Sequence, residues 1–276
     1  MTYRTVAIPL AVSLLAVCVP PVGKTQTEDE KSPILPRGVQ AAAPPAVPDA
    51  RPPLTEEQVA DLHMARKEYK EASAVYRDLA AKSPNNAVYL NKLGIAYHQQ
   101  ALLSPALKYY ERAFKTNPQY ADAMNNVGTV WYQRKRYGKA IKAYRKAIAI
   151  QPDMAILYSN LGYAYFGDKK YEEAIATFRQ AMALDPQVFE HGGSRTGSVL
   201  QDRSVYDRGR FYFLLAKSFA EAGDLERSVR YLRKARDEGF SDMSTVKKDP
   251  AFAAVLKTPG IEELLTPLPK SEAANP

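Results

Sequence analysis

A period of 34 residues constrains this chain more than any other feature. Four residue classes keep the period without slipping across the middle of the sequence. They are the prolines Pro84, Pro118, Pro152 and Pro186; the glycines Gly94, Gly128 and Gly162; the alanines Ala72, Ala106, Ala140 and Ala174; and the aromatic residues Tyr76, Tyr110, Tyr144 and Phe178. Self-similarity at a period of about 20–50 residues indicates stacked structural repeats, none of which buries its apolar face alone.

Each unit has the hydrophobic pattern of two amphipathic helices. In residues 121–152 the first helix places apolar or small residues on one face at Met124, Val127, Gly128 and Trp131, and the second at Tyr137, Ala140, Ile141, Tyr144, Ala147 and Ile148. The residue before each proline is pushed away from helical backbone angles, so the second helix should end there. In residues 87–118 we expect the second helix to start with Ser104 as N-cap and Pro105 at the first helical position.

Small residues should let the two helices of a unit approach closely. We expect Gly128 and Ala140 to lie where the backbones come together, with Tyr144 and Trp131 filling the space that follows. A larger side chain at Gly128 would then overpack the pair.

This pattern resembles the tetratricopeptide repeat. Residues 155–186 supply the motif most fully, as Tyr158, Leu161, Gly162, Tyr165, Tyr171, Ala174, Phe178, Ala181 and Pro186. Residues 87–118 and 121–152 match nearly as well, whereas residues 53–84 are degenerate. The resemblance implies an all-α fold, a right-handed α-solenoid of helix–turn–helix repeats with C-terminal capping helices, in an exported protein of bacterial type.

The remaining segments suggest the domain organisation. Residues 1–19 have the charged start and apolar stretch of a signal peptide, and nine prolines make residues 20–53 a linker. Four repeats span 54–186, an inserted loop follows at 187–207, and a fifth repeat with capping helices spans 208–265, followed by a polar tail at 266–276. We expect a periplasmic or secreted protein; the alternative is a lipid anchor at Cys18, which would be its only attachment to a membrane.

Little in the composition points to catalysis. One cysteine and three histidines provide no recognisable metal site, and no glycine-rich phosphate loop has the required context. We therefore expect no enzyme activity, no cofactor and no metal.

The resemblance implies a groove, lined by the first helix of each unit, that binds a peptide or helix. The side chains expected to face it are Asn91, Lys92, Ile95, His98, Asp122, Asn125, Asn126, Thr129, Tyr132, Ile156, Ser159, Asn160, Tyr163 and Phe166. Asn126 and Asn160 hold equivalent places, and their amides offer donors and acceptors to an extended backbone. Ile95 and Ile156 disfavour the carboxylate clamp of some family members, and the apolar and aromatic groove residues favour a partly hydrophobic ligand segment.

Positive charge is concentrated in one segment of a chain whose formal net charge is +8. Residues 134–146 contain seven cations and no acid: Arg134, Lys135, Arg136, Lys139, Lys142, Arg145 and Lys146. A second basic run comprises Arg227, Arg230, Arg233, Lys234 and Arg236. The alternative function is therefore an adaptor to an anionic surface, namely acidic lipid, polysaccharide or acidic protein; a solvated helix face would give the same pattern. Nucleic acid is not expected as a partner.

Overall fold

A computed structural model describes residues 53–190 and 207–266 of the chain, and every regular element in these ranges is helical. The main helices are α1 (Glu56–Ala65), α2 (Tyr69–Lys82), α3 (Ala87–Gln99), α4 (Leu103–Thr116), α5 (Ala121–Gln133), α6 (Tyr137–Ile150), α7 (Ala155–Gly167), α8 (Tyr171–Leu184), α9 (Arg208–Glu221) and α10 (Leu225–Asp237). Short elements follow as α11 (Thr245–Lys248), η2 (Pro250–Phe252), η3 (Val255–Lys257) and α12 (Ile261–Leu265).

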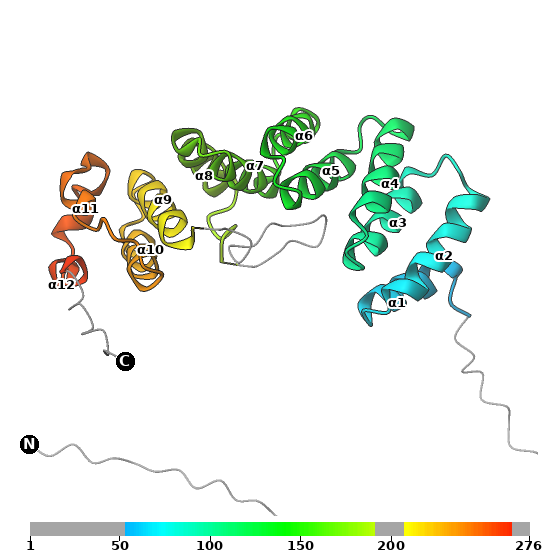
Figure 1. The fold of residues 1–276 in the computed structure, drawn as a ribbon, viewed down its shortest axis with the longest axis horizontal. Helices are drawn as coiled ribbons and strands as arrows, with labels where there is room; N and C mark the ends of the chain where they lie inside the picture. Colours follow the sequence, from blue (N-terminus) through cyan, green and yellow to red (C-terminus); the bar gives the residue numbers. More distant parts are fainter. Residues whose placement is uncertain (1–52, 191–206, 267–276) are drawn as a thin grey trace, which may run out of the picture. The chain divides into compact units, whose positions relative to one another are not determined.

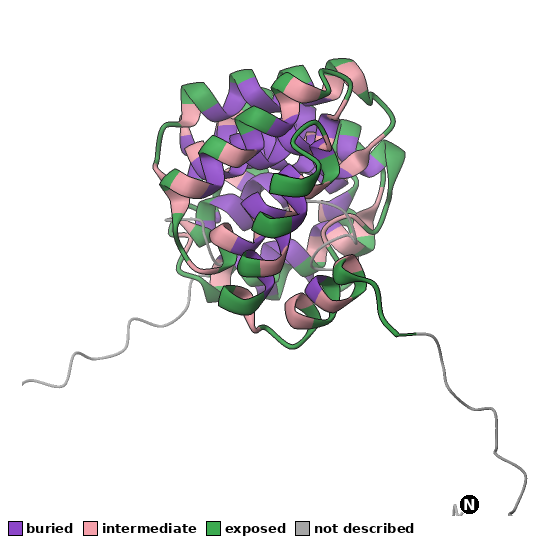
Figure 2. Cartoon of the chain, turned by 90° about the vertical axis from the view of Figure 1, so that its right-hand side faces the viewer, coloured by how far each residue is buried: buried purple, intermediate pink, exposed green. Residues whose placement is uncertain are grey.

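The helices pack as consecutive pairs. Each first helix packs against the second helix of its own unit and, from α3 onward, against the second helix of the unit before, so that the pairs follow one another along the folded part (Figure 1). The first helices α5 and α7 also touch each other directly. Buried residues gather between the helices and exposed ones lie on the outward turns (Figure 2), as expected of units that share a core with their neighbours.

The prolines end the second helices as the sequence predicts. Helices α2, α4, α6 and α8 stop two residues before Pro84, Pro118, Pro152 and Pro186 respectively. The residue between helix and proline leaves the helical region each time; Asn117, for example, has φ −132° and ψ 96°. The clash between the proline ring and the preceding residue thus sets the length of each unit.

The turns inside the units repeat a left-handed residue. Lys67, Ala101, Lys135 and Lys169 have φ between 56° and 62°, and Gly223 has φ 81° at the equivalent turn of the fifth unit. Gly223 lies 223 − 169 = 54 residues after Lys169, which is one period plus 20 inserted residues. A non-glycine residue in this conformation carries backbone strain of roughly 1 kcal/mol.

The predicted start of α4 is wrong. The helix begins at Leu103, with Leu102 as N-cap and no capping side chain, so Ser104 and Pro105 lie inside the first turn. Proline is tolerated there because the first N–H groups of a helix have no partner within it. The turn around Ala101 has the same form as in neighbouring units, and it decides where the helix starts.

Glycine and an aromatic ring make the contact within each regular pair. A Cβ at Gly128 would lie 2.5 Å from Tyr144 Cε1, and one at Gly162 would lie 2.3 Å from Phe178 Cε1. Gly94 approaches Tyr110 in the same way. The close approach predicted from the small residues is therefore confirmed, with the ring of the second helix against the backbone of the first. Trp131 is only partly buried.

The segment after α10 covers the last helix pair. Phe252 and Val255 are fully buried, Ile261 nearly so, and the Phe213 ring of α9 stacks on Phe240 with centroids 4.5 Å apart. These side chains belong to the same apolar cluster as α8 and α9. They keep the terminal face from exposing a large apolar surface.

Candidate functional site

The predicted groove residues lie on α3, α5 and α7, the first helices of three successive units. Lys92, Ile95 and His98 on α3 are partly exposed, as is Asp122 at the start of α5. The others are buried: Asn91, Asn125, Asn126, Thr129, Tyr132, Ile156, Ser159, Asn160, Tyr163 and Phe166. The accessible part of this first-helix face is therefore concentrated at α3 and the start of α5.

Buried asparagines join the first helices. Asn126 Nδ2 donates to Asn91 Oδ1 over 3.0 Å, and Asn160 Nδ2 donates to Asn125 Oδ1 over 2.9 Å. Asn126 and Asn160 are fully buried, where an amide needs partners inside the protein. The expectation that this pair reaches out to a peptide backbone is therefore corrected: their amides brace α3 against α5 and α5 against α7.

The aromatic groove residues also pack inside the protein. Tyr163 stacks on Phe211 of α9 with ring centroids 5.0 Å apart, and Phe166 meets Phe211 edge-on at 5.5 Å. Tyr132 packs edge-on against Tyr137. These contacts belong to the core cluster that joins the fourth unit to the fifth. These aromatic side chains were expected to line the groove, but in the structure they pack together at the junction between units.

A polar cluster at α1 and α3 was not anticipated from the sequence. Lys92 Nζ lies 2.8 Å from Glu57 Oε1 and 2.9 Å from Asp61 Oδ1, and the Tyr76 hydroxyl donates to Asp61. Burial works against a charged Lys92, but the hydrogen bonds to the two carboxylates outweigh it and raise its pKa. The only signal for this cluster in the sequence is the 35-residue separation of Glu57 and Lys92, one more than the period.

The environment of His98 disfavours the charged form of its imidazole. Its Nε2 lies 2.9 Å from Gln133 Oε1 and its Nδ1 lies 3.2 Å from the Tyr110 hydroxyl. Burial lowers the pKa of the imidazole, and the Gln133 hydrogen bond offsets only part of the shift. The His98 ring therefore links α3 to α5, and its burial favours the uncharged form.

One carboxylate oxygen of Asp122 has no hydrogen-bond donor in the described part of the chain. Its Oδ1 is buried, and no hydrogen-bond partner for it exists among the residues that the structure describes. Burial raises the pKa of the carboxyl group. Asn91, one of the nearby groups on this face, already donates to the Tyr120 hydroxyl. A buried oxygen without a partner costs about 1–3 kcal/mol, so this position favours a ligand that brings an N–H group.

The predicted basic face lies on the α5–α6 turn and on the outer side of α6. Six of its seven cations are exposed and Arg134 is partly buried. Arg134 donates to Ser104 Oγ over 2.8 Å and lies 5.4 Å from the centre of the Trp131 ring, while Lys139 Nζ lies 4.1 Å from it. The sequence therefore identified this surface, but the role of Trp131 in holding it together emerges only from the fold.

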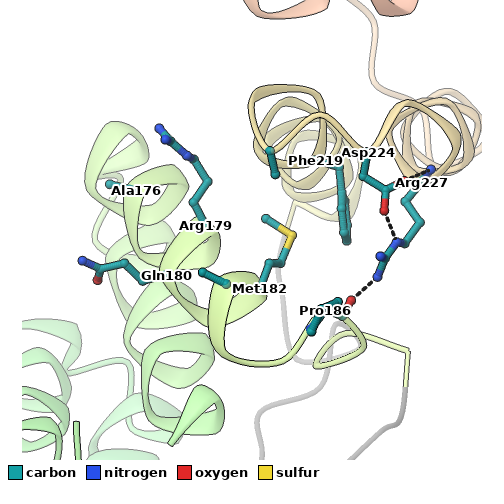
Figure 3. Close-up of a pocket in the computed structure, with 10 residues that line it drawn as sticks. Ala176, Arg179, Gln180, Met182, Pro186, Phe219, Asp224 and Arg227 are labelled. Atoms are coloured by element: carbon teal, nitrogen blue, oxygen red, sulfur yellow. Dashed lines mark hydrogen bonds and ion pairs between the residues drawn. The ribbon is translucent and has the colours of Figure 1, made fainter. Parts of the chain in front are cut away.

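A cleft of about 740 Å³ separates α8 from the α9–α10 turn (Figure 3). Met182 and Phe219 form its apolar floor, and Arg179 and Arg227 stand on opposite sides. Arg227 is bound by Asp224 and by the carbonyl oxygen of Pro186. This cleft was not predicted from the sequence. The one related signal is the insertion before α9, which interrupts the 34-residue period.

No helix in the described ranges is long and apolar enough to cross a membrane. No group of three or more histidine, cysteine, aspartate or glutamate side chains gathers to hold a metal within the same residues. The predictions for residues 1–52 and 267–276, including the signal peptide, Cys18, the linker and the tail, lie outside the described residues, as does most of the inserted loop.

Solved structures with a similar arrangement have low sequence identity. A MamA structure from Desulfovibrio magneticus RS-1 is 20% identical, with 68% of this chain and 94% of that chain covered and a TM-score of 0.48. Pseudomonas aeruginosa pilF is 16% identical, with 69% and 78% covered and a TM-score of 0.49. YrrB, described as a TPR protein with an unusual peptide-binding site, is 17% identical, with 70% and 91% covered and a TM-score of 0.46. A comparison with curated proteins gave no match.

Family models match three stretches of the repeat region. Residues 87–120 and 155–188 each match a tetratricopeptide repeat, and residues 128–169 match a TPR repeat model. These stretches fall on the helix pairs α3–α4, α5–α6 and α7–α8, whose lengths and glycine–aromatic contacts repeat from unit to unit. The chain contains tetratricopeptide repeats, which support a role as a protein-interaction scaffold.

Proposed function

We propose that this scaffold is non-catalytic and binds a peptide or helix of a partner protein on its first-helix face, in an extracytoplasmic assembly. Proteins of this family bind protein or peptide partners. The export setting is supported by the signal-peptide pattern of residues 1–19.

The binding surface that we propose comprises Lys92, Ile95, His98 and Asp122. All four are partly exposed, and they lie on the adjacent first helices α3 and α5. Lys92 and His98 are already fixed by hydrogen bonds to neighbouring helices. Side chains fixed before binding lose little conformational freedom when a ligand arrives.

The observation that carries the proposal is the unsatisfied Oδ1 atom of Asp122. A backbone N–H or a cationic side chain of the partner would supply the missing donor. A hydrogen bond to a charged group contributes about 1.5–3 kcal/mol, which corresponds to roughly 10- to 100-fold in affinity.

Site-specific crosslinking tests the location of the surface. A photoreactive amino acid is introduced at Ile95 on the proposed surface and, as the control, at Ala74 on the exposed side of α2. We expect a crosslinked partner from the envelope fraction with the Ile95 probe and none with the Ala74 probe. Crosslinking from Ala74 alone would place the partner on another face.

The captured partner then allows a test of Asp122. Asp122→Ala should weaken binding about tenfold or more, while the free energy of unfolding does not fall, because a buried oxygen atom without a hydrogen-bond donor is removed. Asp153→Ala, at an exposed position, is the matched control and should leave affinity unchanged. Equal affinity for wild type and Asp122→Ala would refute the role of Asp122.

A further inference from the structure

The two basic runs differ in how their charge is compensated. In the second run, Arg227 pairs with Asp224 at 2.5 Å and Arg230 pairs with Glu190 at 3.1 Å. None of the seven cations of the basic face, Arg134, Lys135, Arg136, Lys139, Lys142, Arg145 and Lys146, forms an ion pair with any described residue. Acids of the same fold pair with part of the second run, whereas no described acid pairs with the basic face.

The basic face also opposes the electrostatics of its own helix. The N-terminus of a helix carries partial positive charge and favours acidic side chains. Helix α6 has no acid in its first turn and no capping side chain, and it starts directly after Arg136. The arrangement is unfavourable for the isolated fold, and a bound anion would relieve it.

Part of this charge is held in place before any ligand binds. Ser104, Trp131, Arg134, Arg136 and Lys139 line a depression of about 600 Å³. The Ser104 hydroxyl fixes Arg134, and the Trp131 ring holds both Arg134 and Lys139 by cation–π contacts. Two guanidinium groups and one ammonium group therefore border a single depression.

The positive charge then continues along the exposed side of α6. Lys142 and Lys146 follow Lys139 at helical spacing on the exposed side of α6. The next second helix, α8, carries Glu172 and Glu173 in its first turn. No described residue of α6 is a large exposed hydrophobic. On α4, the second helix of the unit before α6, exposed Glu111 lies among the cations Lys108, Arg112 and Lys115. Of these three second helices only α6 has no acid, so its charge suits an acidic segment that follows one helix better than a flat bilayer.

The Trp131 ring helps to choose between linear partners. Aromatic rings that bind sugars offer a bare face, whereas this ring carries Lys139 at 4.1 Å. Guanidinium groups bind carboxylates through paired hydrogen bonds. We propose that the basic face docks an acidic peptide segment, rich in glutamate or aspartate, of a partner protein. This second surface extends the scaffold role and does not depend on the Asp122 site.

The test measures binding of a labelled oligoglutamate peptide to the full chain by fluorescence anisotropy, with oligoglutamine of the same length as the neutral probe. Lys139→Glu combined with Lys142→Glu should weaken oligoglutamate binding at least about tenfold. The matched control combines Lys108→Glu with Lys115→Glu, which makes the same change in net charge at exposed positions of the neighbouring helix α4. The control pair should keep wild-type affinity within about twofold.

Three results would overturn the proposal. An equal loss of oligoglutamate affinity in both double variants would show that binding depends on the net charge of the protein and not on the basic face. Binding to phosphatidylglycerol vesicles or to alginate without binding to oligoglutamate would assign the face to a lipid or a polysaccharide. An unchanged affinity in Lys139→Glu with Lys142→Glu would exclude the basic face altogether. Asp122→Ala should bind oligoglutamate as wild type does, which separates this test from that of the first-helix face.

Discussion

Replacing Gly128 by alanine tests the contact on which the repeat fold depends. The added Cβ would lie 2.5, 2.7 and 2.9 Å from three atoms of the Tyr144 ring. Favourable carbon–carbon contacts need about 3.5–4.0 Å, so the ring would have to retreat by roughly 1 Å. Tyr144 is fully buried and its hydroxyl donates to Thr129 Oγ1 over 3.2 Å, so the ring cannot turn away into solvent.

The expected cost follows from two opposing effects. Overpacking of this kind costs about 1–3 kcal/mol, and alanine is favoured over glycine inside a helix by up to about 1 kcal/mol. Gly128→Ala should therefore lower the free energy of unfolding by about 1–2 kcal/mol. The matched control is Gly138→Ala on α6, where an added Cβ meets nothing within 4 Å. That variant should be as stable as wild type or up to about 1 kcal/mol more stable.

Thermal unfolding followed by circular dichroism measures the difference. Each kcal/mol should shift the midpoint by about 2–4 °C in a folded unit of this size. Tyr144→Leu gives a double-mutant cycle, because Gly128→Ala should lose most of its cost once the ring is absent. If Gly128→Ala matched Gly138→Ala in stability, or if Tyr144→Leu left its cost unchanged, the steric argument would fail.

Three further predictions concern the turns, the amide contacts and the buried histidine. Lys169 has φ 61°, so Lys169→Gly should raise the free energy of unfolding by about 0.5–1 kcal/mol; a lower unfolding midpoint would contradict the strain. Asn160→Ala leaves the buried Asn125 Oδ1 without this donor and should destabilise the fold by about 1–3 kcal/mol in denaturant titrations, whereas exposed Asn85→Ala should cost less than about 0.5 kcal/mol. Burial holds the pKa of His98 below its ordinary 6.5. Well above pH 6.5 His98 is neutral in both the folded and the unfolded chain, and as the pH falls through 6.5 the unfolded chain binds the proton first, so stability declines. His98→Gln should flatten this acid-side decline in unfolding midpoints, and an unchanged pH profile would show that His98 does not cause it.

Local signals let the sequence predict most of the fold. Pro118 ends a helix through a steric clash with the residue immediately before it. Gly128 indicates that two helices approach closely, because glycine is the only residue type without a Cβ. Such signals act over a few residues and recur every 34 residues. The same helix pattern in one unit therefore supports the same prediction for the next unit. The exception is Ser104, a good N-cap by type that the turn at Ala101 places inside the helix.

The candidate sites were less predictable from the sequence. Asn126 and Asn160 have the polarity of groove residues, but contacts between helices bury them. The two basic runs look alike as sequence, and the difference between them lies in acids such as Glu190, which is 40 residues from its partner Arg230. Asp122 differs from the other acids of this face only because its Oδ1 atom is buried without a hydrogen-bond donor among the described residues. Which atoms are buried is decided by the tertiary structure.

By itself, then, the sequence determined the helical repeat, its period, the C-terminal ends of the second helices and the existence of a basic segment. The tertiary structure alone decided which polar side chains meet between units. Glu57 with Lys92, Asn91 with Asn126, His98 with Gln133 and Asn125 with Asn160 are each separated by 35 residues. Equivalent positions in the sequence are 34 apart, so these partners are offset by one residue. The offset reflects how each helix is rotated and shifted against the next, and that packing geometry is set by whole helix surfaces, which a period in the sequence does not encode.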